Sequence, residues 1–139
     1  MHLSDSQVAF VNRQPVGRLA TADVKGQPHV IPVCFVYHSE AFYVAIDEKP
    51  KQTLKLKRLR NIAENPQVAL VIDVYSEDWS QLAWLMVQGT AIVWERGDRY
   101  PEVLAALKQK YPPYQQMALE ERPLIEISPG HVVTWGKVE

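Results

Sequence analysis

The residues best suited to bind a ligand lie in one short basic segment, residues 49–60 (KPKQTLKLKRLR). This segment holds six of the fifteen lysines and arginines and no acid, so the other 127 residues carry nine bases against sixteen acids, a net charge of −7. Positive charge concentrated in this way favours a small anion over a nucleic-acid duplex, which usually requires a basic face across the domain. A basic helix that is merely solvated has the same composition, so composition alone does not separate the two interpretations.

The remaining reactive side chains form no catalytic group in the sequence. Cys34 is the single cysteine, which excludes an internal disulfide and a cysteine-rich zinc site. It lies in the apolar stretch PVCFV, where we expect it to be a core residue rather than a nucleophile. The four histidines have no metal-ligand spacing, so no metal site is predicted. Three pairs of adjacent carboxylates fall at expected loops and are interpreted as solvated turns: Asp47-Glu48, Glu77-Asp78 and Glu120-Glu121.

Several signatures of well-known catalytic folds are absent. The sequence has no G-x-G-x-x-G, no phosphate-binding G-x-x-x-x-G-K-[ST] and no hydrolase G-x-S-x-G. The usual dinucleotide fold, the P-loop and the common serine hydrolase are therefore not supported. If the protein is an enzyme, we expect a bound cofactor to carry the chemistry and the protein to supply a pocket and its electrostatics.

Length and hydropathy indicate one domain, residues 1–139. The chain is 47% hydrophobic and 22% charged, enough to bury a core without disulfides. Its apolar runs are far shorter than the ~18 residues of a membrane helix. Its N-terminus lacks the basic stretch, apolar block and cleavage site of a signal peptide. We therefore expect a cytoplasmic protein with no membrane partner.

The elements that must position the basic segment are mostly strands. A capping box of Ser4 and Gln7 predicts a helix over 5–13. Apolar residues at helical spacing predict a second helix within the basic segment, ended by Asn65-Pro66, and a third over about 99–110. Strands are predicted at 17–23, 28–37, 41–47, 67–75, 82–95, 124–128 and 131–137.

Tight turns join consecutive strands, and the first three strands are expected to form a meander. This connectivity argues against a doubly wound α/β fold, which needs helical crossovers between parallel strands. It favours a mainly β fold, a small closed antiparallel barrel with helices at its rim.

Three successive stretches, HVIPV, FYVAID and KRLRNIAENPQVAL, resemble the cofactor site of the flavin-binding split β-barrel family, whose founding member is pyridoxamine 5′-phosphate oxidase. The resemblance covers residues 17–95. A longer set of motifs, GRLATAD, GQPHVIPV, IDEKPK, RLRNI, NP and D-x-Y-x-x-D-W in this order, is similar to the family's small branch that uses the deazaflavin coenzyme F-420. The resemblance implies a six- to seven-stranded antiparallel split β-barrel and an FMN- or F-420-dependent oxidoreductase.

The resemblance also implies a homodimer that binds FMN or coenzyme F-420 at the subunit interface and transfers hydride to or from a small organic substrate. The C-terminal stretch lacks the Trp and Arg that hold the oxidase's pyridoxal-type product, so vitamin B6 oxidation is not expected. Lys49, Lys51 and Lys55 favour coenzyme F-420, with its oligoglutamate tail, over FMN. Aromatic residues around the strand over 82–95 exceed what one barrel face needs, which also favours a two-fold dimer: Trp79, Trp84 and Trp94.

The family's cofactor-binding positions carry over residue by residue. Two adjacent basic residues hold the phosphate, and Lys57 and Arg58 match them, while Lys51 and Arg60 are candidates for the remaining phosphate oxygens. Trp84 stands where the oxidase has a glutamine that contacts the ring, and its indole would either stack on the ring or anchor the dimer interface. Two strands carry the ring, and the matching residues are Val30, Ile31, Pro32 and Val33 on one and Val44, Ala45 and Ile46 on the other.

Other functions stay open at this point. One is a non-catalytic flavin carrier or a haem-binding split barrel, for which His29, His38 or His131 could supply an axial ligand. Another is a nucleic-acid module that uses the basic segment, although the acidity of the remaining chain argues against any nucleic-acid partner. The matched strand residues also fit a plain barrel core. Neither the substrate nor a catalytic side chain can be identified from the sequence.

Overall fold

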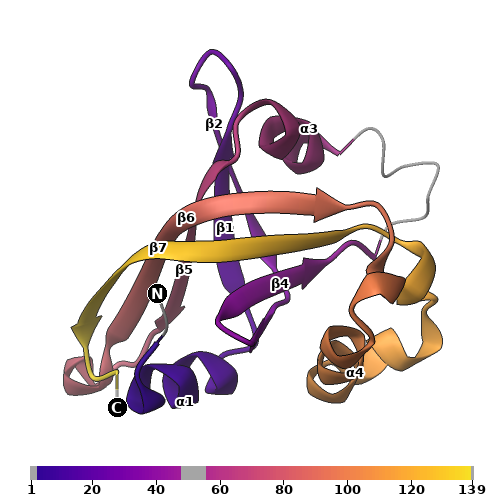
Figure 1. The fold of residues 1–139 in the computed structure, drawn as a ribbon. Coiled ribbons are helices and arrows are strands. Elements are labelled where there is room, and N and C mark those ends of the chain that lie inside the picture. The colour runs from indigo at the N-terminus through magenta and orange to yellow at the C-terminus, as the bar shows by residue number, and fades with distance from the viewer. Residues whose placement is uncertain (1–2, 48–55, 139) are drawn as a thin grey trace.

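The computed structural model describes residues 3–47 and 56–138. Within these residues the α-helices are α1 (Asp5–Arg13), α3 (Lys57–Glu64) and α4 (Pro101–Lys110) (Figure 1). The strands are β1 (Gly17–Ala22), β2 (Pro28–Val33), β3 (Val36–His38), β4 (Ala41–Ala45), β5 (Gln67–Val74), β6 (Ala83–Trp94) and β7 (Leu124–Gly136). Short 3-10 helices are η1 (Trp79–Gln81), η2 (Gly97–Arg99), η3 (Pro112–Gln116) and η4 (Leu119–Glu121).

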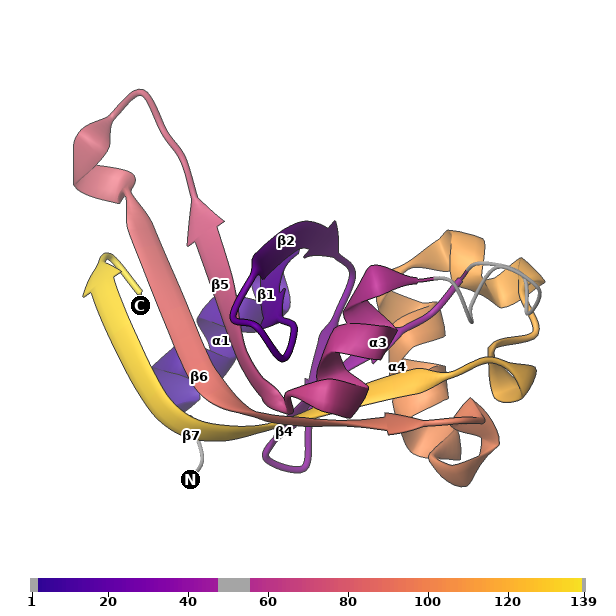
Figure 2. The same ribbon diagram turned by 90° about the horizontal axis from the view of Figure 1, so that it is seen from above.

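The seven strands form one antiparallel sheet in the order β2-β1-β5-β6-β7-β4-β3. The sheet is strongly curved, as Figure 2 shows from above. Alternate side chains of a strand point to opposite faces, so β4 contributes to two cores. Phe42 and Val44 pack in the main core inside the curve, which α1 completes with Phe10. Tyr43 packs in a second core between the sheet and α4. The mainly β, antiparallel split-barrel fold is thus confirmed.

The predicted closed barrel is wrong, and the predicted meander is right in both of its antiparallel pairings but not in the continuity of its middle strand. In the described chain β2 pairs with β1, and β3 pairs with β4. β2 and β3 are therefore the two edge strands of the sheet. The expected single strand over 28–37 is therefore interrupted at Cys34 and Phe35, and β4 pairs with β7 instead of with β2. The barrel is split between β2 and β3.

A tyrosine from beyond α4 explains the interruption. The Phe35 side chain is fully buried in the main core. Its backbone N–H donates to the Tyr111 hydroxyl oxygen at 3.0 Å. That hydroxyl lies 2.8 Å from the carbonyl oxygen of Pro15 and 3.0 Å from that of Phe35. Because a side chain satisfies these backbone groups, Phe35 needs no neighbouring strand.

The C-terminal pair of predicted strands is one strand, β7, with a bulge. Gln88 of β6 pairs with His131, whereas Gly89 pairs with Pro129, so Gly130 is an extra residue on β7. A Cβ atom on Gly89 would lie 2.1 Å from the Ser128 carbonyl oxygen, which explains the glycine. The close approach of the two strands at the bulge therefore requires glycine at position 89.

The helices follow their sequence signals closely. In α1 the Gln7 N–H donates to the Ser4 hydroxyl at 3.2 Å and the Ser4 N–H donates to the Gln7 side chain at 2.9 Å, as the capping box requires. Helix α4 begins at Pro101, two residues later than predicted, because proline suits a first helical position. No helix within 3–47 and 56–138 has the length and apolarity needed to cross a membrane.

Candidate functional site

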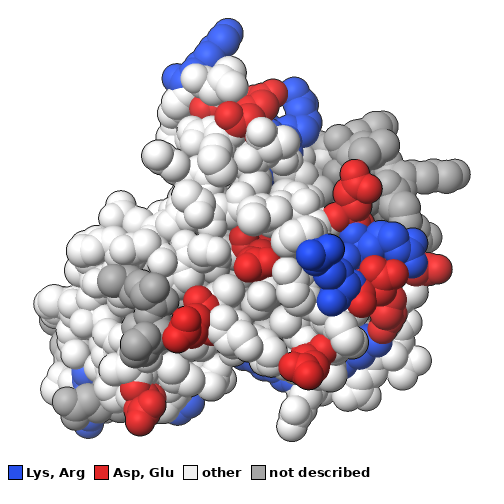
Figure 3. All heavy atoms as spheres, in the orientation of Figure 1, with Lys and Arg blue, Asp and Glu red and all other residues white. Residues whose placement is uncertain are grey.

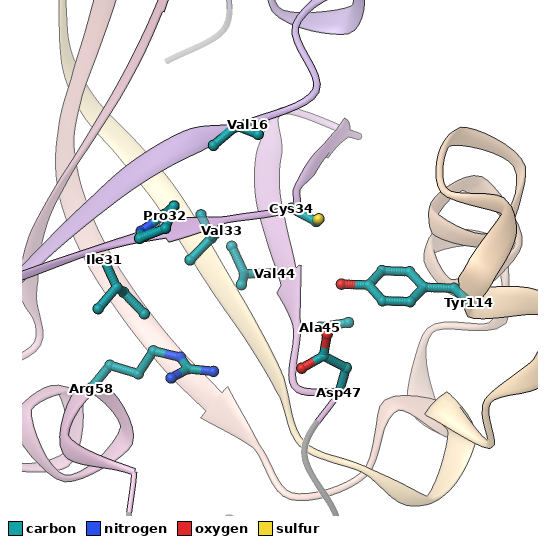
Figure 4. Close-up of a pocket in the computed structure, with 10 residues that line it drawn as sticks. All are labelled: Val16, Ile31, Pro32, Val33, Cys34, Val44, Ala45, Asp47, Arg58 and Tyr114. Carbon is teal, nitrogen blue, oxygen red and sulfur yellow. The ribbon is translucent and has the colours of Figure 1, made fainter.

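A cavity of about 370 Å³ lies beside the split between β2 and β3. Its lining comes from segments far apart in sequence, and Figure 4 shows their side chains around a common space. The contributors are the residue before β1, the end of β2, the end of β4, the first turn of α3, and η3. The lining residues are Val16, Ile31, Pro32, Val33, Cys34, Val44, Ala45, Asp47, Arg58 and Tyr114.

The apolar walls of the cavity are two strand ends without a neighbour on the cavity side. β2 is an edge strand of the sheet, so three successive residues, Ile31 to Val33, border the cavity. β3 pairs with β4 only over Ala41–Tyr43, so Val44 and Ala45 of β4 have no pairing partner in β3. Backbone N–H and C=O groups along such an edge can pair with a ligand as they would with another strand. Small Ala45 allows a flat ligand to approach the backbone closely.

Arg58 supplies positive charge to this apolar space. It is the second residue of α3, and Figure 4 shows its guanidinium extending from the helix toward the other lining residues. The first turn of α3 contains no acid, and no side chain caps its N-terminus. The positive end of the helix dipole and the guanidinium therefore act together, an arrangement that favours an anion.

Lys57 is directed elsewhere, although it precedes Arg58. Adjacent residues diverge by about 100° around a helix, and the Lys57 ammonium lies 3.6 Å from a carboxylate oxygen of Asp23. Asp23 also accepts the backbone N–H groups of Gln27 and Lys25, each at 2.9 Å. The hydrogen bond from Gln27 is the largest cause that holds the pKa of Asp23 below its ordinary value, and Lys57 adds to it. Lys57 thus ties α3 to the turn after β1.

Residues 3–136 match the family described as pyridoxamine 5′-phosphate oxidase. The chain belongs to this family. It is 28% identical over 142 residues to the 5a,11a-dehydrotetracycline/5a,11a-dehydrooxytetracycline reductase of Streptomyces rimosus subsp. rimosus, a match that covers 98% of this chain and 84% of the reductase.

Solved structures carry the same fold. HutZ, the heme storage protein from Vibrio cholerae, superposes with a TM-score of 0.72 at 21% identity, covering 99% of this chain and 96% of HutZ. A structure described as F420 Reductase superposes with a TM-score of 0.68 at 20% identity, covering 94% of this chain and 98% of that one. At such identities these likenesses establish the fold alone.

The structure brings together six of the positions carried over from the pyridoxamine 5′-phosphate oxidase family: Ile31, Pro32, Val33, Val44, Ala45 and Arg58. Of the other carried-over positions, those that the structure describes do not line the cavity. Val30 is 61% exposed and Ile46 is fully buried in the main core. Arg60 is exposed on α3. Lys51 lies outside the described residues.

Trp84 lies on the outer face of the sheet, in a separate hollow. It lines that hollow with Val71 and Met86, beside an ion pair in which Arg18 and Asp73 approach to 2.6 Å. Its partner across the β6–β7 ladder is a second tryptophan, Trp135, 52% exposed. In the view of Figure 3 charged side chains are sparse over β6 and β7 and gather nearer α4 and the turn after β1. Trp84 therefore lies on the outer face of the sheet, among apolar side chains and one exposed ion pair.

Three polar residues of the cavity were not identified as site residues from the sequence. Cys34, expected in the core, is half-buried: it packs against the second core and also lines the cavity. Asp47, interpreted as part of a solvated turn, is exposed as expected and also lines the cavity. Tyr114 comes from η3, about eighty residues beyond β2 and about seventy beyond β4. The stretch PPYQQ carries no motif that links it to the strands, so local pattern could not have found Tyr114.

Proposed function

We propose that this protein is an oxidoreductase that binds FMN or coenzyme F-420 in the 370 Å³ cavity and transfers hydride between that cofactor and a small organic substrate. The observation that carries the proposal is the Arg58 guanidinium, which extends from an uncapped helix start into an apolar space bordered by two open strand ends. A flat ring with a phosphate-bearing tail needs these features together.

The residues present fit such a group. Arg58 and the first N–H groups of α3 would hold the phosphate through charge-assisted hydrogen bonds. Ile31, Val33 and Val44 would cover the faces of the ring, and the cavity volume lies within the range of small-molecule sites. When bound, the flavin or deazaflavin supplies the hydride chemistry. The protein's own part is to bind it, orient it and limit water around it.

Of the two cofactors we favour coenzyme F-420. The S. rimosus relative is named as a reductase, and one structure with this fold is described as F420 Reductase. Lysines at 49, 51 and 55 in the basic segment would suit an anionic oligoglutamate tail, although they lie outside the described residues. FMN carries one phosphate and needs no such additional charge.

The active form in this proposal is a homodimer. The outer face of β5, β6 and β7 carries the apolar side chains of Val71, Trp84, Met86 and Trp135 beside the Arg18–Asp73 ion pair. Exposed apolar patches mark interaction surfaces, and tryptophans are common anchors within them. A two-fold contact through this surface would bury well over ~1,000 Å².

The haem-binding alternative draws less support from the cavity. None of its ten lining residues is a histidine. His38 lines a separate hollow, 3.7 Å from the Glu102 carboxylate. His29 and His131 line neither of these two spaces. A haem would therefore need a ligand other than the imidazoles proposed from the sequence.

The absorption spectrum of the purified protein tests this proposal. The protein is mixed separately with FMN, coenzyme F-420 and haem, and unbound ligand is removed by gel filtration. We expect retention of coenzyme F-420, or of FMN, with a perturbed visible band and no stoichiometric haem band. Stoichiometric haem with no retained flavin or deazaflavin would contradict the proposal.

A further inference from the structure

The cavity has a second polar end opposite Arg58. Figure 4 shows the guanidinium of Arg58 and the hydroxyl of Tyr114 extending into the common space from opposite sides. Cys34 and Asp47 line the cavity on the Tyr114 side. Apolar residues line the cavity between its two polar ends. A ligand that fills the cavity would therefore meet a cation at one end and a hydroxyl, a thiol and a carboxylate at the other.

Tyr114 is held firmly in its position. Tyr114 is 5% exposed, and the centre of its ring lies 5.6 Å from the centre of the Tyr111 ring. Tyr111 in turn fixes η3 to the strand break through its hydrogen bonds with Phe35 and Pro15. Lys110 adds a hydrogen bond of 3.1 Å to the Phe35 carbonyl and lies 3.8 Å from the Phe35 ring centre. A side chain fixed in this way loses little entropy when it binds a ligand.

The chemistry at this end suits an uncharged oxygen. Burial is the main cause that raises the pKa of Tyr114 above its ordinary value, and neighbouring Cys34 and Asp47 raise it further. The hydroxyl therefore keeps its proton at neutral pH and can donate it in a hydrogen bond. Arg122 donates a hydrogen bond to the backbone oxygen of Asp47 at 2.7 Å and so fixes this residue. The Asp47 side-chain carboxylate disfavours an anion at this end of the cavity. A carbonyl oxygen satisfies both conditions.

We propose that the Tyr114 hydroxyl donates a hydrogen bond to a carbonyl oxygen on the ring of the bound flavin or deazaflavin, while Arg58 faces the phosphate-bearing part. This inference rests on the proposed function and adds a ring-recognising residue from η3, a segment that contributes no position carried over from the family. Tyr114 is a binding residue in this account, and no proton transfer to substrate is assigned to it.

Tyr114→Phe tests the contact, because it removes the hydroxyl and keeps the ring that fills the core. We expect cofactor affinity to fall about two- to tenfold, the range of a neutral hydrogen bond, and the visible absorption maximum of the bound cofactor to shift. Tyr100→Phe is the matched control, since its hydroxyl donates to Glu126 at 3.2 Å in the second core and does not line the cavity. Unchanged affinity and spectrum in Tyr114→Phe would overturn the inference.

A measurement on the wild type keeps the test independent of how the variant folds. Cys34 is the single cysteine and lines the same end of the cavity, so iodoacetamide reports on that end alone. We expect the rate of Cys34 alkylation to fall in proportion to the fraction of protein that has bound cofactor, and to be lowest at saturation. An unchanged alkylation rate at saturation would mean that the ring does not reach Tyr114, and it would overturn the inference. Failure of the wild type to bind either cofactor would instead overturn the proposed function itself.

Discussion

Lys57 and Arg58 are neighbours in the chain, yet their side chains are directed to different parts of the molecule. Arg58 faces the cavity, whereas Lys57 pairs with Asp23 at the turn after β1. The family motif predicts both at the phosphate, because adjacency in a motif does not reveal which way each side chain points. Six of the carried-over positions nevertheless meet at one cavity. Side-chain direction and the contribution of Tyr114 depend on tertiary contacts that no local pattern encodes.

At the residue scale, the Tyr111 hydroxyl is expected to contribute measurably to stability. Tyr111→Phe leaves the N–H of buried Phe35 without its 3.0 Å partner and removes the contact with Pro15. An unsatisfied buried donor costs about 1–3 kcal/mol. We therefore expect the free energy of unfolding to fall by about that amount in urea. Tyr75→Phe is the control, since Tyr75 is 65% exposed and should change little. Equal stabilities of the two variants would contradict this explanation of the strand break.

The buried tyrosines predict how the fold responds to alkali. Burial raises the pKa of Tyr43 to about 12 and that of Tyr111 to about 12. Because both values lie above the ordinary value of about 10, these groups stabilise the fold fully below pH 10, and their contribution is lost as the pH rises through 12. We expect some tyrosines to ionise only as the protein unfolds, in a titration followed by phenolate absorbance and circular dichroism. Ionisation of all six tyrosines near pH 10 in a folded protein would contradict this.

At the scale of elements, helices and most strand positions were predictable because capping, proline and alternation are local signals. The capping box of α1 and the end of α3 before Asn65-Pro66 are examples. Two features were not predictable. The interruption at Cys34 and Phe35 depends on Tyr111, which is 76 residues away from Phe35. The pairing of β4 with β7 joins distant segments, whereas the sequence suggested a meander of neighbours.

The β6–β7 bulge yields a matched pair of glycine substitutions. Gly89→Ala places a Cβ 2.1 Å from the Ser128 carbonyl oxygen, a backbone atom that cannot move without disturbing the ladder. A Cβ on Gly130 would meet its nearest atom, the Gln88 carbonyl oxygen, at 3.5 Å, an ordinary contact. We expect thermal unfolding to show Gly89→Ala destabilised by about 3 kcal/mol or more, and Gly130→Ala close to wild type. The opposite ranking would mean that the bulge is wrongly assigned.

At the scale of the whole molecule, the apolar outer face of the sheet predicts association. We expect sedimentation at micromolar concentration to give twice the 15.9 kDa mass of one chain. Trp84→Glu places a charge on this face and should give a folded monomer. Val24→Glu is the control, because Val24 is 69% exposed at the turn after β1. A wild-type protein that sediments only as a 15.9 kDa species would contradict the proposed dimer.

Arg58 is the anion-binding residue of the proposed cofactor cavity, and the proposed function depends on it. Fluorescence titration of wild type and Arg58→Ala with coenzyme F-420 and with FMN tests this most directly. Arg96→Ala, an exposed arginine paired with Asp98 at 3.1 Å, is the matched control. Loss of a charge-assisted contact should weaken cofactor binding about ten- to a hundredfold in Arg58→Ala and leave Arg96→Ala unchanged. Equal cofactor affinities of the wild type and Arg58→Ala would contradict the account.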